Sequence, residues 1–330
     1  MAVGRMPAEW APHERTLIAW PCRRELWGPV LEQARRDTAA VANAIAAFEP
    51  VTMVANPGEQ AAQARRACAA AVEVVELAID DSWLRDSGPL FVDGGAGRRV
   101  GVCFRFNAWG ERFSPYDADV VAGEALAARY ADAVVRAPLV LEGGSVCVDG
   151  EGALIATEQC LLHPTRNPAL TRERIEDALR EHLGAERIVW LGMGLSEDRD
   201  TDGHVDLVAA FTAPGEVLLQ AAPAGGPDHE RMEDNAARLA AAGLRVRRLD
   251  VLPHAEVAGE TVVVSHMNLY LCQGAAIVPL AGAATDEDAL AQIAQALPGR
   301  ELVGVPGAVL AYGGGGPHCI TQQVPARCAP

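Results

Sequence analysis

The segment TRERIEDALREHLG, residues 171–184, contains the helix of the unit from which this chain is built. Ile175, Leu179 and Leu183 recur at helical spacing, so one face of the predicted helix is apolar and packs on a core. A threonine is a good N-cap at its start, and Gly184 is a typical C-terminal stop. Short runs rich in β-branched residues lie on both sides of it, which indicates strands flanking the helix.

The same pattern recurs along the chain. We expect helices at 29–47, 58–71, 119–131, 171–183, 228–242 and 286–296. We expect strands at 16–20, 51–55, 72–78, 89–93, 100–106, 139–141, 145–148, 153–157, 187–191, 205–212, 216–221, 245–250, 269–272, 275–280 and 302–304. The last four helices follow one another about every 55 residues, with about three strands between them. Repeated β-β-α-β units favour a radial or layered α/β arrangement over one doubly wound sheet.

The composition bounds the possible functions. Half of the 330 residues are hydrophobic, and no linker divides the chain, so we expect one domain over residues 1–330. No G-x-G-x-x-G joins a strand to a helix, which argues against a dinucleotide fold. The formal net charge of −16 argues against nucleic acid or an anionic membrane as partner and suits a cationic small molecule, although acidity also serves solubility alone.

The cysteines indicate a reducing compartment. The eight are scattered without a C-x-x-C pair, and neither a signal peptide nor a membrane-length apolar run is present, so we expect a cytoplasmic protein. Four lie in strand-like stretches and are expected to be small buried hydrophobes: Cys103, Cys147, Cys160 and Cys272. Three more have no evident role: Cys22, Cys68 and Cys328. Cys319 differs, because YGGGGPHC at 312–319 places four glycines and a proline before it, and we expect a nucleophile presented at a strand end.

Three further stretches place polar groups beside glycine: WLRDSGP at 83–89, LEGGS at 141–145 and DTDGHVD at 200–206. In a strand, His204 and Asp206 would project to one face, where they could bind a metal, form an acid/base pair or satisfy each other structurally. No further histidine or cysteine ligand is adjacent, so we expect no metal.

Two carboxylates in these stretches have simpler interpretations when taken singly. Asp86 could be a turn residue or the partner of Arg85, and Glu142 could be a surface carboxylate beside a turn. Their combination with one thiol and one histidine is more informative. Two carboxylates can grip a planar guanidinium, a thiolate can attack its central carbon, and a histidine can carry protons.

These motifs, in this order, resemble those of the agmatine deiminase family, which belongs to the guanidino-group-modifying superfamily and neighbours the bacterial peptidylarginine deiminases. The resemblance covers about the whole chain. Its six motifs are MPAEWAPHERTLIAWP (6–21), WLRDSGP (83–89), FNAWG (106–110), LEGGSVCVDGEGALIATEQCLLHPTRNP (141–168), DTDGHVD (200–206) and HCITQQVP (318–325). The resemblance implies a five-bladed pseudo-symmetric α/β propeller of β-β-α-β modules, the pentein fold.

The resemblance also implies roles for the catalytic residues. Cys319 corresponds to the nucleophile, His204 to the general acid/base, and Glu142 to the residue that orients His204. His318 stands beside Cys319, but neighbouring residues of an extended segment face opposite ways, so His204 is the preferred base. Either a cationic His204 or the bound guanidinium could activate the thiol.

Other positions correspond to substrate-binding residues. Asp86 and Asp206 match the carboxylates that bind the guanidinium, and Asp200 is a further candidate in the same motif. Trp83 and Trp109 match the walls of the pocket, placed for apolar and cation–π contact.

The implied activity is hydrolytic deimination of a small guanidino compound, foremost agmatine to N-carbamoylputrescine and ammonia, through a covalent amidino-cysteine. Deimination of free arginine, peptidyl arginine or a biosynthetic intermediate stays open, as do amidine transfer to an amine and a non-enzymatic binding role. Cysteine-protease chemistry would leave Asp86 and Asp206 unexplained. No metal or organic cofactor is required, and the family implies a homodimer.

Two loops depart from the family pattern. Gly316 and Pro317 replace an asparagine and an apolar residue, and ERFSPYDAD at 111–119 replaces further glycines and an aromatic residue. We expect both loops at the mouth of the pocket, where the rest of the substrate is recognised.

Overall fold

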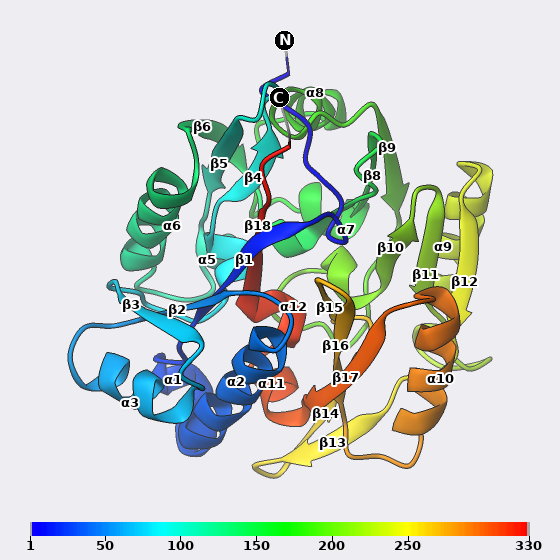
Figure 1. Ribbon diagram of the computed structural model, residues 1–330. Helices are drawn as coiled ribbons and strands as arrows, with labels where there is room; N and C mark the ends of the chain where they lie inside the picture. Colours follow the sequence, from blue (N-terminus) through cyan, green and yellow to red (C-terminus); the bar gives the residue numbers. More distant parts are fainter. Residues whose placement is uncertain (1, 329–330) are drawn as a thin grey trace.

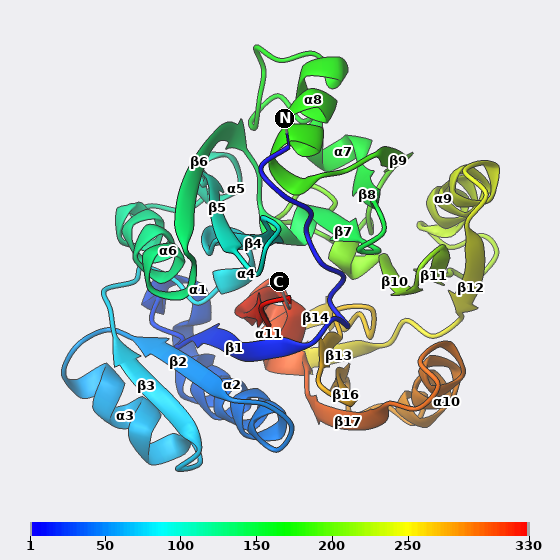
Figure 2. The same cartoon turned by 45° about the horizontal axis from the view of Figure 1, so that its top comes forward.

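The structure, a computed structural model, describes residues 2–328, which form small sheets set around a common centre with helices on their outer sides (Figures 1 and 2). In the described residues, five mixed sheets follow one plan. Each starts with an antiparallel pair and ends with a parallel pair, and a helix connects the two parallel strands. This arrangement confirms the predicted five-bladed α/β propeller of β-β-α-β modules.

Four blades are continuous in sequence. They are β4 (Leu90–Asp93), β5 (Arg99–Arg105), α6 (Asp117–Tyr130) and β6 (Ala133–Val140); β7 (Val146–Val148), β8 (Ala153–Thr157), α8 (Arg172–Leu183) and β9 (Arg187–Leu191); β10 (Ala209–Ala213), β11 (Glu216–Gln220), α9 (His229–Ala241) and β12 (Arg245–Leu249); and β15 (Tyr270–Cys272), β16 (Ala275–Leu280), α10 (Asp286–Ala296) and β17 (Glu301–Pro306).

The fifth blade joins the two ends of the chain. It consists of β18 (Thr321–Pro325), β1 (His13–Ala19), α2 (Leu31–Ala46) and β2 (Val51–Ala55), extended by α3 (Glu59–Ala67) and β3 (Val72–Glu76). The antiparallel pairing of β1 with β18 closes the ring, and Figure 1 shows the blue and red strands side by side. Because β18 begins two residues after Cys319, ring closure also fixes the segment that carries this thiol.

Shorter elements connect the strands and helices of the blades. They are α1 (Arg24–Trp27), α4 (Leu84–Ser87), α5 (Ala108–Glu111), α7 (Glu158–Leu161), α11 (Ala308–Tyr312), α12 (Pro317–Ile320) and the 3-10 turns η1 (Gly28–Val30), η2 (Gly143–Ser145) and η3 (Val205–Leu207). Helix α4 packs against η2 and α12, and η2 packs against η3. Segments far apart in the sequence therefore meet at the centre of the ring.

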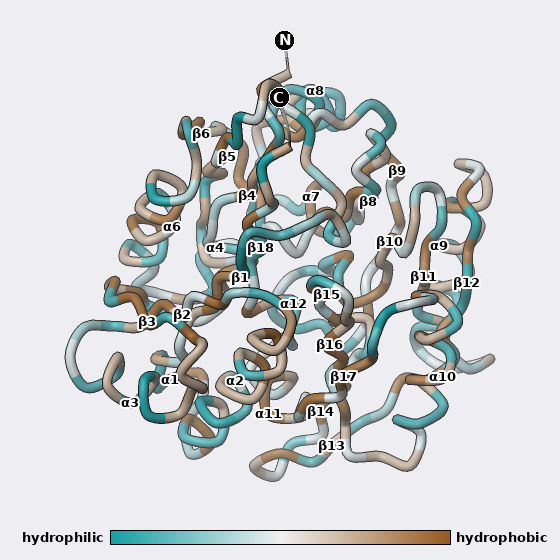
Figure 3. The backbone as a smooth tube through the Cα atoms, in the orientation of Figure 1, coloured by the Kyte–Doolittle hydropathy of each residue, from teal (hydrophilic) through white to brown (hydrophobic). Residues whose placement is uncertain are grey.

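The core lies between the sheets and their helices. Hydrophobic residues follow strands such as β11 and β16, whereas α3 is mostly hydrophilic (Figure 3). Ile175, Leu179 and Leu183 of α8 are buried as the sequence predicts, and Gly184 ends the helix in a left-handed conformation. No helix within residues 2–328 has both the length and the apolar character that crossing a membrane requires.

Three predictions of strands were wrong. The strand expected at 139–141 is the end of β6, which begins at Ala133. The expected strand at 205–212 starts only at Ala209, because the Asp198 carboxylate accepts backbone N–H bonds from Thr201, Gly203 and His204 and holds the preceding loop in a turn. A hairpin of β13 (His254–Val257) and β14 (Glu260–Val263) was not expected. Its two turn residues have positive φ, and alanine is an unusual residue at the first of them.

Candidate active site

Cys319 lies at the centre of the ring, buried on α12. Its Sγ accepts a hydrogen bond from Asn268 Nδ2 at 3.1 Å and lies 3.3 Å from Asp206 Oδ2. The backbone N–H of Cys319 donates to Asn268 Oδ1 at 3.3 Å, so the Asn268 amide bonds to both the backbone and the sulfur of this residue. Burial, Asp206 and Asp86 together raise the pKa of the thiol well above its ordinary value, so sulfur stays protonated until positive charge arrives.

The segment before Cys319 must be glycine because there is no room for side chains beside the site. A Cβ on Gly315 would lie 2.8 Å from Cys319 Sγ and 2.7 Å from the Trp83 ring. A Cβ on Gly316 would lie 2.7 Å from Asn268 Oδ1. Gly314 has φ of 103°, which side-chain-bearing residues rarely adopt. The backbone therefore passes directly beside the thiol, and the turn is a short helix rather than the expected end of a strand.

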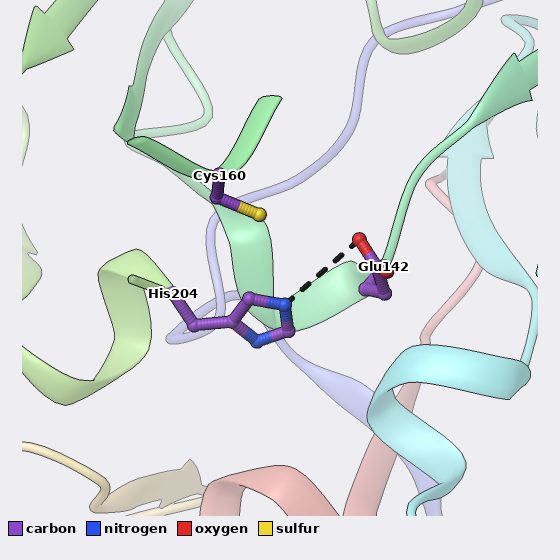
Figure 4. A group of neighbouring side chains, drawn as sticks. All are labelled: Glu142, Cys160 and His204. Carbon is purple, nitrogen blue, oxygen red and sulfur yellow. Dashed lines mark ion pairs between the residues drawn. The ribbon is translucent and has the colours of Figure 1, made fainter. Parts of the chain in front are cut away.

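His204 is fully buried among acidic groups. Its Nδ1 lies 3.9 Å from Asp86 Oδ1 and 4.0 Å from Asp206 Oδ1. Its Nε2 lies 3.9 Å from Glu142 Oε2 (Figure 4). These distances exceed hydrogen-bond length, and neither ring nitrogen has a hydrogen-bond partner. Burial lowers the pKa of His204, but Asp86, Cys160 and Glu142 outweigh it and hold the pKa well above its usual range. The ring is therefore an imidazolium with N–H groups free for a ligand.

Glu142 is held by a buried ion pair. Its Oε1 accepts from Arg166 Nε at 2.6 Å, and both side chains are fully buried. Burial raises the pKa of Glu142, but His204 and Arg166 outweigh burial and lower it. Arg166 also donates to Thr201 O at 3.1 Å and to Asp202 Oδ2 at 2.8 Å, which ties three loops together. The remaining oxygen, Glu142 Oε2, has no partner and faces His204.

Asp86 is one of two carboxylates that flank the thiol. Its Oδ1 accepts from the backbone N–H of Gly144 and its Oδ2 from Trp109 Nε1, both at 2.9 Å. Burial, with Asp206 and Glu142 nearby, raises its pKa, although His204 opposes the shift. A Cβ on Gly144 would lie within 3.0 Å of His204 Nδ1, Asp206 Oδ2 and Asp86 Oδ1, so this glycine leaves room for all three groups.

Asp206 is the second carboxylate. Its Oδ2 lies 2.8 Å from His318 Nδ1, whereas its Oδ1 is buried without a partner. Burial raises its pKa, but His318 and His204 outweigh burial and lower it. Two buried carboxylates beside a neutral thiol are an environment for a cation.

Aromatic rings wall a pocket that ends at Cys319 and Asp86. Trp83, Trp109 and Phe113 line it, and Asp200 stands farther out with a side chain that is about one third exposed. Trp109 has φ of 56°, a left-handed conformation that is strained for a tryptophan and aims the indole N–H at Asp86. Of the two divergent loops, the one at 111–119 reaches this pocket through Phe113, whereas Gly316 and Pro317 do not line it; Gly316 lines a separate pocket instead.

Residues 5–325 match the family model of the Porphyromonas-type peptidyl-arginine deiminases. This chain belongs to that family. The agmatine deiminase of Stutzerimonas stutzeri is 41% identical, with 97% of this chain and 95% of the relative covered. The solved agmatine deiminase of Enterococcus faecalis has a TM-score of 0.92 and 34% identity, covering 99% of this chain and 97% of that one. DDAH from Pseudomonas aeruginosa, at 15% identity and a TM-score of 0.56 over 94% of this chain and 99% of that one, shares the fold. The resemblance predicted from the sequence is confirmed.

In this deiminase-family chain, the predicted site residues lie together. Cys319, Asp86, Asp206, His204 and Glu142 form one buried cluster, connected by the distances above. Trp83, Trp109 and Asp200 line its approach.

Sequence reasoning missed four contacts of this family member. Arg166 and Glu9 stand inside quoted motifs but nothing singled them out, and Asn268 carries no local signal. His318 was expected to face away from the site, yet α12 is a helical turn, and its ring contacts Asp206. The expectation failed because successive side chains of a helix are not on opposite faces.

Cys160 was expected to be a core hydrophobe on a strand, but it lies on the short helix α7 beside His204 (Figure 4). Ligand atoms of Glu142, Cys160 and His204 lie within 4.8 Å of one another, a donor set that could hold a metal ion. Glu142 already pairs with the cationic Arg166, which would repel a second cation. The arrangement fits a histidine held beside a thiol and a carboxylate better than a metal centre.

Proposed function

We propose that this chain hydrolyses agmatine to N-carbamoylputrescine and ammonia, with Cys319 as nucleophile and His204 as general acid and base. The observation that carries the proposal is the buried cluster itself. A thiol, an imidazolium without partners and two carboxylates surround one small space. The names of the relatives at about 40% identity support agmatine as the substrate.

Binding places the guanidinium between Asp86 and Asp206. Asp206 Oδ1 has no partner in the protein and can accept from the substrate, and the rings of Trp83 and Trp109 flank the planar cation. The positive charge offsets the two carboxylates that raise the thiol pKa, so Cys319 releases its proton to solvent as the substrate enters. In this proposal the bound guanidinium, and not His204, activates the thiol, since no hydrogen bond joins His204 to Cys319.

The tail of agmatine extends past the aromatic walls toward Asp200. A terminal ammonium would meet this carboxylate at the mouth. Free arginine would bring its α-carboxylate close to the same acidic group, and the nearby Arg112 is already occupied by Asp202 at 3.2 Å and Asp200 at 3.8 Å. The charge at the mouth therefore favours agmatine over arginine.

The chemistry proceeds in two halves. The Cys319 thiolate adds to the guanidinium carbon, His204 gives a proton to the leaving nitrogen, the carbon–nitrogen bond breaks, and ammonia departs. Neutral His204 then takes a proton from water, whose oxygen adds to the same carbon. The carbon–sulfur bond breaks and restores the thiolate, and the ureido product releases its extra proton to solvent. Glu142, fixed by Arg166, orients His204 and keeps it basic.

Location and assembly also belong to the proposal. All eight cysteines are free, which suits a reducing cytoplasm, and a homodimer is expected from the family resemblance. Amidine transfer is the second candidate, because the same thiol and histidine would serve it.

The test incubates the purified chain with agmatine, arginine and an arginine peptide and measures ammonia and ureido product, with and without an added amine. We expect release of both products from agmatine without the amine, abolished in Cys319→Ser and retained in the exposed-cysteine control Cys328→Ser. Full activity of Cys319→Ser would refute the assignment, and turnover only with the amine would favour transfer.

A further inference from the structure

A chain of polar contacts leads from the thiol to the N-terminal segment. Cys319 Sγ lies 3.3 Å from Asp206 Oδ2, the same oxygen lies 2.8 Å from His318 Nδ1, and His318 Nε2 lies 2.8 Å from Glu9 Oε2. None of these contacts beyond Cys319 and Asp206 is used by the proposed reaction. The imidazole is clamped between two carboxylates.

The clamp defines the charge of His318. Carboxylates only accept hydrogen bonds, so a ring that donates from both nitrogens satisfies both partners, and this ring is the imidazolium. Burial and Arg85 lower the pKa of His318, but Glu9 and Asp206 outweigh them and raise it. Glu9 is ionised, since His318, Arg85 and the Leu271 N–H overcome its burial and bring its pKa to about 2.

The clamp reaches solvent by a route separate from the substrate pocket. Glu9, His318 and Asp206 line a second pocket that shares no lining residue with the aromatic pocket at Cys319. The His318 side chain is 13% exposed and that of Glu9 is 17% exposed. The protonation of His318 can therefore follow bulk pH while substrate fills the other pocket.

We propose that His318 is a positioning residue, which Glu9 holds in place and which fixes the Asp206 carboxylate so that Oδ1 stays free for the guanidinium while Oδ2 faces Cys319. The inference rests on the proposed function. His318 is not a second general base, because both of its nitrogens are engaged by carboxylates. Its cationic charge also compensates Asp206, which otherwise opposes ionisation of the thiol.

Two substitutions separate the two halves of the clamp. The amide of His318→Asn replaces the donor at Nδ1 and keeps the bond to Asp206, whereas that of His318→Gln replaces Nε2 and keeps only the bond to Glu9. We expect kcat/KM for agmatine to fall by roughly 10- to 100-fold in His318→Gln, the value of a lost charge-assisted hydrogen bond, and by clearly less in His318→Asn. Equal losses in the two variants would overturn the proposal.

Glu9→Gln removes the negative charge beside His318 and keeps a side-chain oxygen that can accept its hydrogen bond. With one carboxylate fewer, His318 gives up its proton at lower pH, so the alkaline limb of the kcat/KM profile moves to lower pH. The matched control is Glu197→Gln, which neutralises the carboxylate of an exposed histidine–glutamate contact of 2.7 Å with His254 of β13. An unchanged pH profile of kcat/KM in Glu9→Gln would contradict the inference. If Glu9 had only a structural role, its replacement would alter stability and leave the alkaline limb of that profile in place.

A readout without substrate separates this inference from the proposed function. Alkylation of Cys319 by iodoacetamide, followed by peptide mass spectrometry against pH, reports the ionisation of this thiol alone. We expect the profile of His318→Gln to lie at higher pH than that of the wild-type chain, since Asp206 loses its cation. If the wild-type chain does not turn over agmatine but this shift is found, the proposed substrate fails and the clamp stands. If turnover occurs and the shift is missing, the clamp fails.

Discussion

Replacement of Gly144 by alanine adds one methyl group and tests the geometry of the proposed active site. The ideal Cβ at this position would lie 2.6 Å from His204 Nδ1, 2.9 Å from Asp206 Oδ2 and 3.0 Å from Asp86 Oδ1. All three neighbours are buried, and Asp86 also bonds to the backbone N–H of Gly144. The added methyl group of Gly144→Ala therefore occupies space beside the proposed guanidinium position.

The expected magnitude follows from these distances. A carbon–nitrogen contact relaxes only near 3.3 Å, so the ring of His204 must move by about 0.7 Å, and a misplacement of about 1 Å in a catalytic group costs about 100-fold in rate. We expect kcat/KM for agmatine to fall about 100-fold, equivalent to about 2.7 kcal/mol of transition-state stabilisation. Overpacking lowers the free energy of unfolding by about 1–3 kcal/mol, which shifts Tm by only a few degrees in a chain of this size.

The assay is steady-state ammonia release, with Tm measured on the same samples. Gly192→Ala is the matched control, because its Cβ would also meet an atom at 2.6 Å, but that atom is Oδ2 of Asp234, the end of a flexible and half-exposed side chain. We expect Gly192→Ala to keep wild-type activity. Wild-type kcat/KM in Gly144→Ala would refute the geometry, and equal losses in both variants would show that the effect is general.

Three further changes have defined outcomes. Arg166→Met leaves the buried Glu142 without its cation, so chemical denaturation should show a loss of roughly 3 kcal/mol or more and activity should fall; wild-type stability would contradict the ion pair. Asp200→Asn should raise KM for agmatine several-fold with little change in kcat, and unchanged KM would exclude Asp200 as the partner of the ammonium. Burial raises the pKa of Asp119 to about 7 in the folded chain, above its unfolded value, so the stability contributed by its neutral form is present at low pH and is lost as pH rises through 7. Asp119→Asn can keep both N–H bonds that Oδ1 accepts, so its Tm advantage over the wild-type chain should grow between pH 5 and pH 8, and a constant difference would contradict this.

The sequence was sufficient for the repeat and for the cluster, for different reasons. The helix at 171–183 shows its apolar face and its caps locally, and the blades follow from the recurrence of such units. Cys319, His204 and Glu142 stand beside glycines at positions where a side chain would clash with the site, and these glycines are visible in the sequence.

The remaining contacts depend on how distant segments meet. Arg166, Asn268 and Glu9 contact the site only because the ring brings loops from separate blades to its centre, and no periodicity reports such contacts. His318 was misplaced because the four residues of α12 turn helically between two stretches of extended backbone. Local patterns thus located the proposed reacting groups but not the residues that hold them.

The most direct test of the account is a rapid acid quench during agmatine turnover, followed by peptide mass spectrometry of the eight cysteines. The account predicts that the peptide carrying Cys319 gains the mass of agmatine less one ammonia, and that the gain disappears when substrate is exhausted. An adduct on Cys160 or another cysteine, or continued turnover of Cys319→Ser, would contradict the claim that this thiol forms the covalent intermediate.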